Sequence, residues 1–289
     1  MGVTRSWRNR LMLVALVAAA VAAGVWWINQ GDPIPDHPPA SAPKVGSCWT
    51  VSPQTARRAL PWPGRPVDCA GPHTAEVYHV GQVDRDLVQR ARAASGDDRT
   101  VAVNLMYAQA RRACGAFGSG YLGGDWHATR VALIASWVQP STNGFFGCAV
   151  AQAGDPGGEG FVTRTGSLRG RAGQLAVGCV TREADTVRFA SCTDAHTGEF
   201  VGTYIVTPNG APFDARAVTA AVTRGCGQVT LSYLGLSADA SRPDLHVGYV
   251  GPTTAATWLG SDQTFACYAS ADAPVRGTVR SLGTRPLPR

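Results

Sequence analysis

The sequence predicts an α+β protein made of two tandem homologous modules, each a mostly antiparallel sheet with one main helix, behind an N-terminal transmembrane helix. Three observations lead to this prediction: one apolar run near the N-terminus, eight cysteines in two matching groups of four, and alternating strand-like and helix-like patterns between them. The predicted organisation is a cytoplasmic N-terminus (1–10), a transmembrane helix (11–28), a proline-rich linker (29–45), a first repeat (46–170), a second repeat (171–283) and a tail (284–289).

Composition favours a folded protein and argues against a nucleic-acid partner. Hydrophobic residues make up 45% of the 289 residues and charged residues only 16%, so the protein can bury a core. The formal net charge is +6, but Arg5, Arg8 and Arg10 all precede the apolar run, and the remainder is nearly balanced. Nucleic-acid binding normally requires a concentrated basic surface, which we therefore do not expect here.

The apolar run at residues 11–28 predicts the location of the protein. Its length is near the lower limit for a helix that spans a bilayer. The three preceding arginines place the N-terminus in the cytoplasm, and Trp26 and Trp27 suit the far interface. The alternative is a cleaved signal peptide, because residues 20–22 fit a small-x-small cleavage site. Both alternatives place the remaining residues outside the cytoplasm.

The cysteines indicate an internal duplication. The two groups are Cys48, Cys69, Cys114 and Cys148, then Cys179, Cys192, Cys226 and Cys267. In each group a histidine follows the second cysteine by four residues, a glutamate comes three residues later, and Tyr-Leu-Gly follows the third cysteine. A Gly-hydroxyl-aliphatic-Arg segment follows the fourth cysteine, at 166–169 and 277–280. Ordered matches at nearly fixed offsets predict a repeat.

An even number of cysteines in an exported protein predicts disulfides. If both repeats pair alike, three patterns are possible. We favour first with second and third with fourth, because the short loop between Cys179 and Cys192 suits neighbouring strands and the longer loop can pin a helix to a sheet. The favoured bridges are Cys48–Cys69, Cys114–Cys148, Cys179–Cys192 and Cys226–Cys267.

The segments between the cysteines predict the elements of each module. Strands are expected at 75–83, 129–137, 199–206 and 245–250 and around Cys148 and Cys267. Helical spacing places the following residues on buried helix faces: Met106, Ala110 and Cys114, and Val218, Val222 and Cys226. Asp214 is expected to cap the second helix. The polar stretch at 84–98 carries the extra length of the first repeat, and the glycine-rich stretch at 154–160 is expected to be a loop.

This paired cysteine framework, with Pro-His-x-x-Glu-Val, Tyr-Leu-Gly and a tryptophan before the final cysteine, resembles the septum-formation domain proteins of high-GC Gram-positive bacteria. The resemblance covers about residues 46–283. It implies an extracytoplasmic role in division or the cell envelope, and it supplies no catalytic residues. The first repeat departs from the pattern by lacking the Trp-x-Gly found at 258–260.

The best candidates for a metal or acid–base site are the two histidine–glutamate pairs, His73 with Glu76 and His196 with Glu199. Their spacing argues against such a site, because residues i and i+3 on a strand point to opposite faces. We therefore expect them to hydrogen-bond to the backbone near the disulfides. Trp62, which lies between two prolines, is the tryptophan most expected to be exposed and to contact a ligand such as a sugar ring.

The expected function is that of a membrane-anchored, extracytoplasmic binding or scaffold protein for septum or envelope assembly, without catalytic activity and without a cofactor or metal. Its expected partners are the membrane, through residues 11–28, and an envelope or division protein. The alternative is a cell-envelope hydrolase with a site between the two repeats. A cleft there with converging Glu, His, Ser or Asp side chains would favour the hydrolase.

Overall fold

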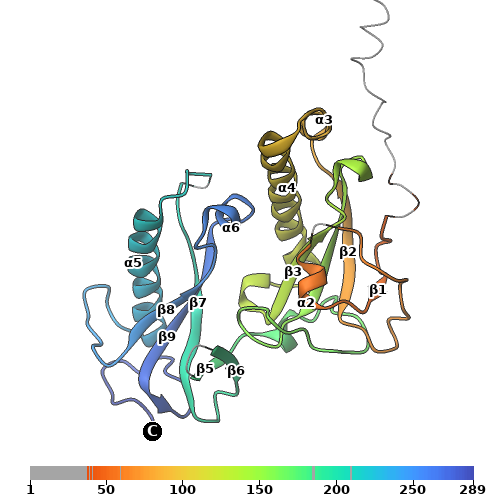
Figure 1. Cartoon of the computed structure of the whole chain (residues 1–289). Coiled ribbons are helices and arrows are strands. Elements are labelled where there is room, and N and C mark those ends of the chain that lie inside the picture. The colour runs from red at the N-terminus through yellow and green to blue at the C-terminus, as the bar shows by residue number, and fades with distance from the viewer. Residues whose placement is uncertain (1–37, 39, 41, 59, 184–185, 209) are drawn as a thin grey trace, which may run out of the picture. The chain divides into compact units, whose positions relative to one another are not determined.

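The computed structural model describes residues 38–289, except 39, 41, 59, 184–185 and 209. The predicted cytoplasmic N-terminus (1–10), transmembrane helix (11–28) and most of the linker (29–45) lie outside the described residues. Within the described part of the protein, no helix is long and apolar enough to cross a membrane. This part is α+β, as predicted, and its two sheets are antiparallel (Figure 1).

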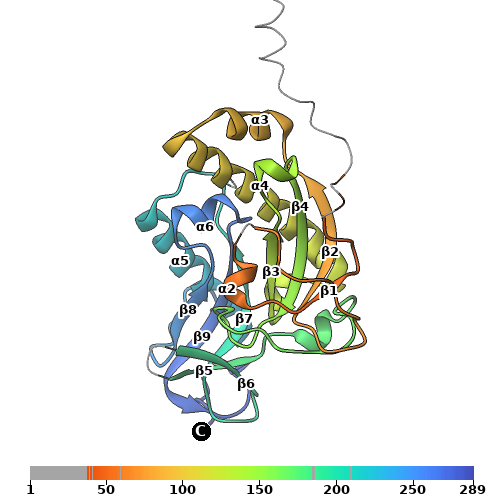
Figure 2. The same ribbon diagram turned by 45° about the vertical axis from the view of Figure 1, so that its right-hand side comes forward.

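The first half of the described part, residues 38–170, holds a four-stranded sheet in the order β1-β2-β4-β3. Its elements are β1 (Cys48–Trp49), α2 (Pro53–Ala56), β2 (Ala75–Gln82), α3 (Arg85–Ala93), α4 (Gly96–Leu122), η1 (Trp126–Ala128), β3 (Val131–Ser136), η2 (Pro140–Thr142) and β4 (Phe145–Gln152). Because neighbouring side chains on a strand point to opposite faces, Leu133 contacts α4 at Gly118 whereas Ile134 packs into a core on the other face. The sheet is therefore covered on both faces (Figure 2).

The second half, residues 171–289, holds a five-stranded sheet in the order β6-β5-β7-β9-β8. Its elements are η3 (Ala172–Leu175), β5 (Cys179–Glu183), β6 (Thr186–Ala190), β7 (His196–Ile205), α5 (Ala215–Leu234), β8 (His246–Val250), α6 (Ala255–Leu259) and β9 (Thr264–Val275). Asp214 caps α5, as expected, because its side chain accepts a hydrogen bond from the Ala217 N–H at 2.9 Å. The buried face of α5 packs with Phe265 and Cys267 of β9 in one core.

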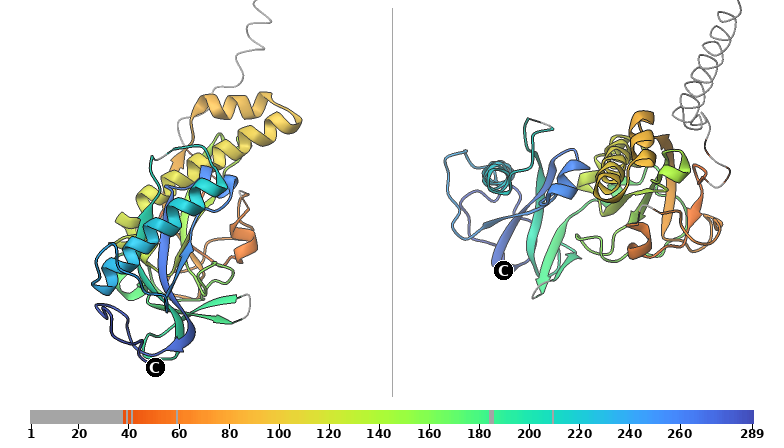
Figure 3. Two further views of the ribbon diagram at one scale, coloured as in Figure 1. Left: turned by 90° about the vertical axis from the view of Figure 1, so that its left-hand side faces the viewer. Right: turned by 45° about the horizontal axis from the view of Figure 1, so that its top comes forward.

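The polar stretch at 84–98 contains a helix that the sequence analysis does not predict. Asp84 caps α3 by accepting from the Leu87 N–H at 3.1 Å, and Leu87, Val88 and Ala91 are buried. Three apolar residues among many charges are enough to pack a short amphipathic helix against α4 (Figure 3). The extra length of the first half therefore forms an ordered element.

Four disulfides join the pairs that the sequence favours. Cys48–Cys69 and Cys179–Cys192 close the shorter loops, with sequence separations of 21 and 13 residues. Cys114–Cys148 ties α4 to β4, and Cys226–Cys267 ties α5 to β9. Each half thus has one bridge near its first strands and one bridge between its main helix and its sheet.

Trp62 is buried, which corrects the expectation that it is the exposed tryptophan. Its exposed fraction is 5%. The centroid of its ring lies 5.8 Å from the ring centroid of Trp49 and 4.9 Å from that of Trp137. The prolines on either side exclude regular structure, as expected, but the segment folds back over the sheet and buries the indole in an aromatic cluster. Trp62 therefore supports the core of the first half and is not placed to contact a ligand.

Candidate functional site

The glutamate of the first histidine–glutamate pair holds the segment that follows the fourth cysteine. Glu76 is 5% exposed, and its carboxylate accepts from the Ser167 hydroxyl at 2.8 Å and from the Leu168 N–H at 2.9 Å. The Tyr121 hydroxyl lies 3.2 Å from the Ser167 hydroxyl, and the Arg169 guanidinium lies over the Tyr121 ring. These contacts give the Tyr-Leu-Gly and Gly-hydroxyl-aliphatic-Arg motifs a structural role.

The second half has the corresponding contacts with one more hydrogen bond. The Glu199 carboxylate accepts from the Thr278 hydroxyl at 2.5 Å, from the Val279 N–H at 2.7 Å and from the Tyr233 hydroxyl at 2.5 Å. Arg280 lies over the Tyr233 ring. Burial, followed by the hydrogen bond to Glu199, raises the pKa of Tyr233 above its usual range, so the phenol stays a donor.

Both predicted histidines are buried, and both bond to the backbone two residues earlier. His73 is 1% exposed and His196 is fully buried. The Nδ1 atom of each lies 2.9 Å from a carbonyl oxygen, that of Gly71 or Asp194, so Nδ1–H is the donor. These contacts fix the tautomer of each ring, and the Nε2 atoms have no hydrogen-bond partner among the described residues.

Only the second pair lies in a group that resembles a metal site, among the residues that the structure describes. Ligand atoms of Cys179, His196 and Glu199 lie within 4.8 Å of one another. The argument that strand spacing separates histidine from glutamate is therefore wrong here, because the register shifts between His196 and Gly198. However, the Cys179 sulfur is bonded to Cys192 and the Glu199 oxygens already accept three hydrogen bonds, so this group has few free ligand atoms.

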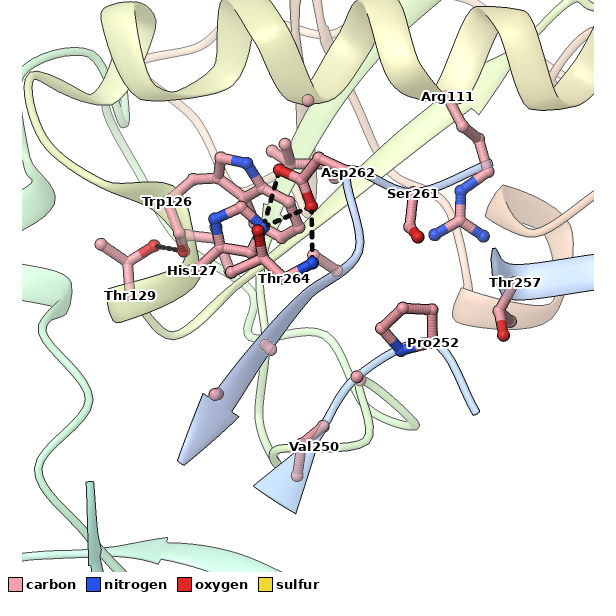
Figure 4. A pocket seen from close by; sticks show the side chains of 18 of the residues that line it. Arg111, Trp126, His127, Thr129, Val250, Pro252, Thr257, Ser261, Asp262 and Thr264 are labelled. Carbon is pink, nitrogen blue, oxygen red and sulfur yellow. Dashed lines mark hydrogen bonds and ion pairs between the residues drawn. The ribbon is translucent and has the colours of Figure 1, made fainter. Parts of the chain in front are cut away.

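A pocket of about 330 Å³ lies between the two halves, and we call it the central pocket (Figure 4). Its walls come from α4, η1 and β3 of the first half and from β8, α6 and β9 of the second half. Along β9, Phe265 and Cys267 face α5, so the alternate residues Thr264, Ala266 and Tyr268 face the pocket. The face of the second sheet that α5 leaves uncovered therefore forms one wall.

The Trp-x-Gly segment of the second half makes the contact with α4 beside this pocket. A Cβ atom at Gly260 would lie 3.4 Å from the Ala108 Cα and 3.3 Å from the Arg111 Cδ, so the approach is close enough to favour glycine. Next to it, the Arg112 guanidinium donates to the Leu259 carbonyl oxygen. A role in joining the halves explains why the first half has no Trp-x-Gly between its third and fourth cysteines.

His127 forms an ion-pair bridge between the halves inside the pocket. Its Nδ1 lies 3.0 Å from the Asp125 carboxylate, and its Nε2 lies 3.1 Å from the Asp262 carboxylate of the second half. Burial works to lower the pKa of His127, but the hydrogen bonds and charges of Asp262 and Asp125 outweigh it and raise the pKa. Burial also works to raise the pKa of Asp262, and the His127 bond and charge lower it overall. We call these three residues the His127 bridge.

The other polar side chains of the pocket differ in how they are paired. The Ser261 hydroxyl donates to the Trp258 carbonyl oxygen at 3.0 Å and accepts from the Gln263 N–H at 3.1 Å. Thr257 belongs to the capping box of α6. Arg111, in contrast, makes no hydrogen bond or ion pair with any other residue that the structure describes, and its guanidinium points into the pocket (Figure 4).

Sequence reasoning missed the residues of this pocket, including Arg111, His127 and Asp262. His127 and Asp262 are 135 residues apart, and no spacing pattern links them. The Trp-x-Gly at 258–260 was the one available signal, because it marks where the second half departs from the first.

Comparison with known proteins agrees with the resemblance seen in the sequence. A family model described as septum formation matches residues 45–267, which is most of the protein. No curated protein and no solved structure matches it.

Proposed function

Because the protein belongs to the septum formation family, we propose that it acts in septum formation as a binding protein outside the cytoplasm, without catalytic activity. In this proposal residues 11–28 anchor it to the membrane with its N-terminus in the cytoplasm, and the described part meets an envelope or division protein. The central pocket is the proposed binding site.

The disulfides support a location outside the cytoplasm. All eight cysteines are paired in four bridges, and disulfides persist in oxidising compartments but are rare where thiols are kept reduced. The apolar run at 11–28 supplies the signal for export in this proposal.

The matching contacts support the proposal that the halves are homologous repeats. In both halves a buried glutamate accepts from a hydroxyl and the next backbone N–H, at 167–168 and at 278–279. In both halves a left-handed glycine, Gly123 or Gly235, ends the main helix directly after Tyr-Leu. Two such units can meet along one shared surface, and the central pocket lies there.

The main support for a binding role is that the two side chains that could act in catalysis, His127 and Ser261, are already hydrogen-bonded to other groups of the protein. A general base needs a free nitrogen, but both ring nitrogens of His127 are held by carboxylates, which favours the imidazolium form. A nucleophile needs a base within reach, but the Ser261 hydroxyl is bonded within its own turn. This arrangement suits recognition better than catalysis.

The hydrolase remains a second candidate, because His127, Asp262 and Ser261 do line one cleft between the halves. It predicts that His127→Gln abolishes hydrolysis of cell-wall fragments while the variant still folds. If the wild-type protein releases no new ends from such fragments, the hydrolase is excluded.

Proximity labelling in living cells tests the binding role. The full-length protein carries a labelling tag at its C-terminus. The test variant is Ala266→Phe, which fills the central pocket, and the control is Ala220→Phe, which adds the same side chain at an exposed position of α5. We expect the wild type and Ala220→Phe to label envelope or division proteins, and Ala266→Phe to lose some of them. An unchanged set for Ala266→Phe contradicts the pocket as the binding site, and labelling of cytosolic proteins alone contradicts the topology.

A further inference from the structure

The charged side chains that line the central pocket differ in whether they have a partner. The charged and titratable residues that line it are Arg111, Arg112, His127 and Asp262, and the carboxylates of Asp262 and Asp125 both pair with His127. The Arg112 guanidinium is held at the Leu259 carbonyl oxygen. The Arg111 guanidinium has neither an anionic partner nor a carbonyl acceptor among the described residues, and its Cζ atom lies 6.0 Å from the centre of the Tyr107 ring.

The position of Arg111 is built into the contact between the halves. Its aliphatic stem lies against Gly260, where an added Cβ would meet the Arg111 Cβ at 3.4 Å and Cδ at 3.3 Å. With the stem packed there, the guanidinium extends into the pocket near Ser261 and above Pro252 (Figure 4). A guanidinium offers two parallel N–H donors that match a carboxylate.

The rest of the pocket is mainly apolar. Much of its wall comes from aliphatic and aromatic side chains, including Leu133, Val177, Val250, Pro252, Ala266 and Tyr268. Burial raises the pKa of Tyr268 to about 12, so its phenol is neutral at physiological pH and adds no charge. At about 330 Å³ the pocket is at the small end of ligand sites and has room for one or two residues of a peptide.

We propose that the central pocket binds a carboxylate carried on a small apolar group, with Arg111 as the residue that pairs with the carboxylate. A guanidinium that has no anionic partner of its own matches a carboxylate, which accepts two parallel N–H bonds. A phosphate dianion would bring a second negative charge into a pocket that the Asp262 carboxylate already lines. This inference rests on the proposed binding role of the pocket and adds the chemical class of its ligand.

Calorimetry on the full-length protein in lipid nanodiscs tests the assignment. The probes are N-acetyl-leucine, its neutral amide, phenyl phosphate, and a short peptide that ends in a free leucine carboxylate. We expect the acid to bind at least about tenfold more tightly than the amide, and Arg111→Gln to remove that preference. The matched control is Arg224→Gln, an exposed arginine two residues before the α5 cysteine, as Arg112 is on α4, and it should bind the acid like the wild type.

Each outcome separates this inference from the proposal on which it rests. Equal binding of acid and amide, unaffected by Arg111→Gln, overturns the carboxylate assignment but leaves a binding pocket. Tighter binding of phenyl phosphate overturns it in favour of phosphate. Absence of binding by all four probes overturns the ligand class and removes this support for the pocket. Tighter binding of the peptide than of N-acetyl-leucine supports the proposal and identifies the carboxyl end of a polypeptide, rather than a free acid, as the source. Thermal unfolding of each variant shows that it is folded, and the acid-to-amide ratio compares probes within one protein.

Discussion

Glu76 and Glu199 are each bonded within their own half of the protein. Replacing each of them by glutamine tests whether its carboxylate stabilises that half. Glutamine keeps the shape of the side chain but has only one acceptor oxygen. In Glu199→Gln, the amide oxygen can accept from the Val279 N–H only if the NH₂ is turned toward the Thr278 and Tyr233 hydroxyls, which must then accept instead of donate. In Glu76→Gln, keeping the amide oxygen at the Leu168 N–H likewise turns the NH₂ toward the Ser167 hydroxyl.

The expected magnitude follows from the number of bonds. A hydrogen bond to a charged group contributes about 1.5–3 kcal/mol and one to a neutral group about 0.5–1.5 kcal/mol, so each retained bond weakens by about 1 kcal/mol. Glu76 has two bonds, and Glu199 has a third, from the Tyr233 hydroxyl. We expect Glu76→Gln to lower the free energy of unfolding by about 2 kcal/mol and Glu199→Gln by about 3 kcal/mol.

Urea unfolding of the variants measures these differences. The Tyr233→Phe variant removes the extra bond, so the cycle with Glu199→Gln should give a coupling energy of about 1 kcal/mol. The matched control is Glu183→Gln, whose side chain is 61% exposed and lies 3.6 Å from Arg188, and it should change stability by less than about 0.5 kcal/mol. The reasoning is refuted if Glu199→Gln is as stable as the wild type, or if Glu76→Gln costs more than Glu199→Gln.

Three further predictions concern the His127 bridge between the halves, glycines of the main helices, and the disulfides. The His127 bridge should contribute about 1 kcal/mol, since both its carboxylates are about half exposed, with Asp125 at 51% and Asp262 at 45%. The stabilisation that comes from His127 is fully present below its unfolded-state pKa of about 6.5 and is lost as pH rises through its raised folded-state pKa. The stabilisation that comes from Asp262 is lost as pH falls through its lowered folded-state pKa. The stability difference between wild type and His127→Gln should therefore be larger at pH 5 than at pH 9 in urea unfolding, and equal differences would contradict the bridge. Gly225→Ala should destabilise the protein by about 1–3 kcal/mol, because its Cβ would lie 2.3 Å from the Tyr204 ring. Gly120→Ala, whose Cβ would meet no atom within 4 Å, should stabilise the protein by about 0.5–1 kcal/mol. Thermal unfolding of each variant gives the sign of the change. Replacing Cys226 and Cys267 together by alanine should cost about 1 kcal/mol more than replacing Cys179 and Cys192, because the loops span 41 and 13 residues; the reverse order in urea would argue against loop entropy as the cause.

The parts of the fold that local pattern decides were predictable. Met106, Ala110 and Cys114 follow the helical period, and all three are buried on α4. The disulfide pairs followed from loop lengths and from the expectation that both repeats pair alike. The structural part played by Glu76 and Glu199 agrees with the expectation that buried polar groups are hydrogen-bonded.

The parts that depend on distant contacts were not predictable. Trp62 was expected at the surface because of its flanking prolines, but those prolines restrict only the backbone and do not determine which surface the indole meets. The central pocket arises where α4 of one half meets the open face of the other sheet, and no local period encodes that meeting. The α3 helix was not predicted because its sequence is mostly charged and polar, and only three of its side chains are buried.

The contacts of Glu199 have a practical consequence for how far the protein can be shortened. The family match ends at residue 267, but the Glu199 carboxylate accepts hydrogen bonds from Thr278 and Val279, and the Arg276 N–H donates to the Pro288 carbonyl oxygen at 3.0 Å. A protein trimmed to the matched boundary would lose these donors and leave a buried anion without them. For expression, crystallisation or fusion to a reporter, the last twenty or so residues belong to the folded core and should be kept.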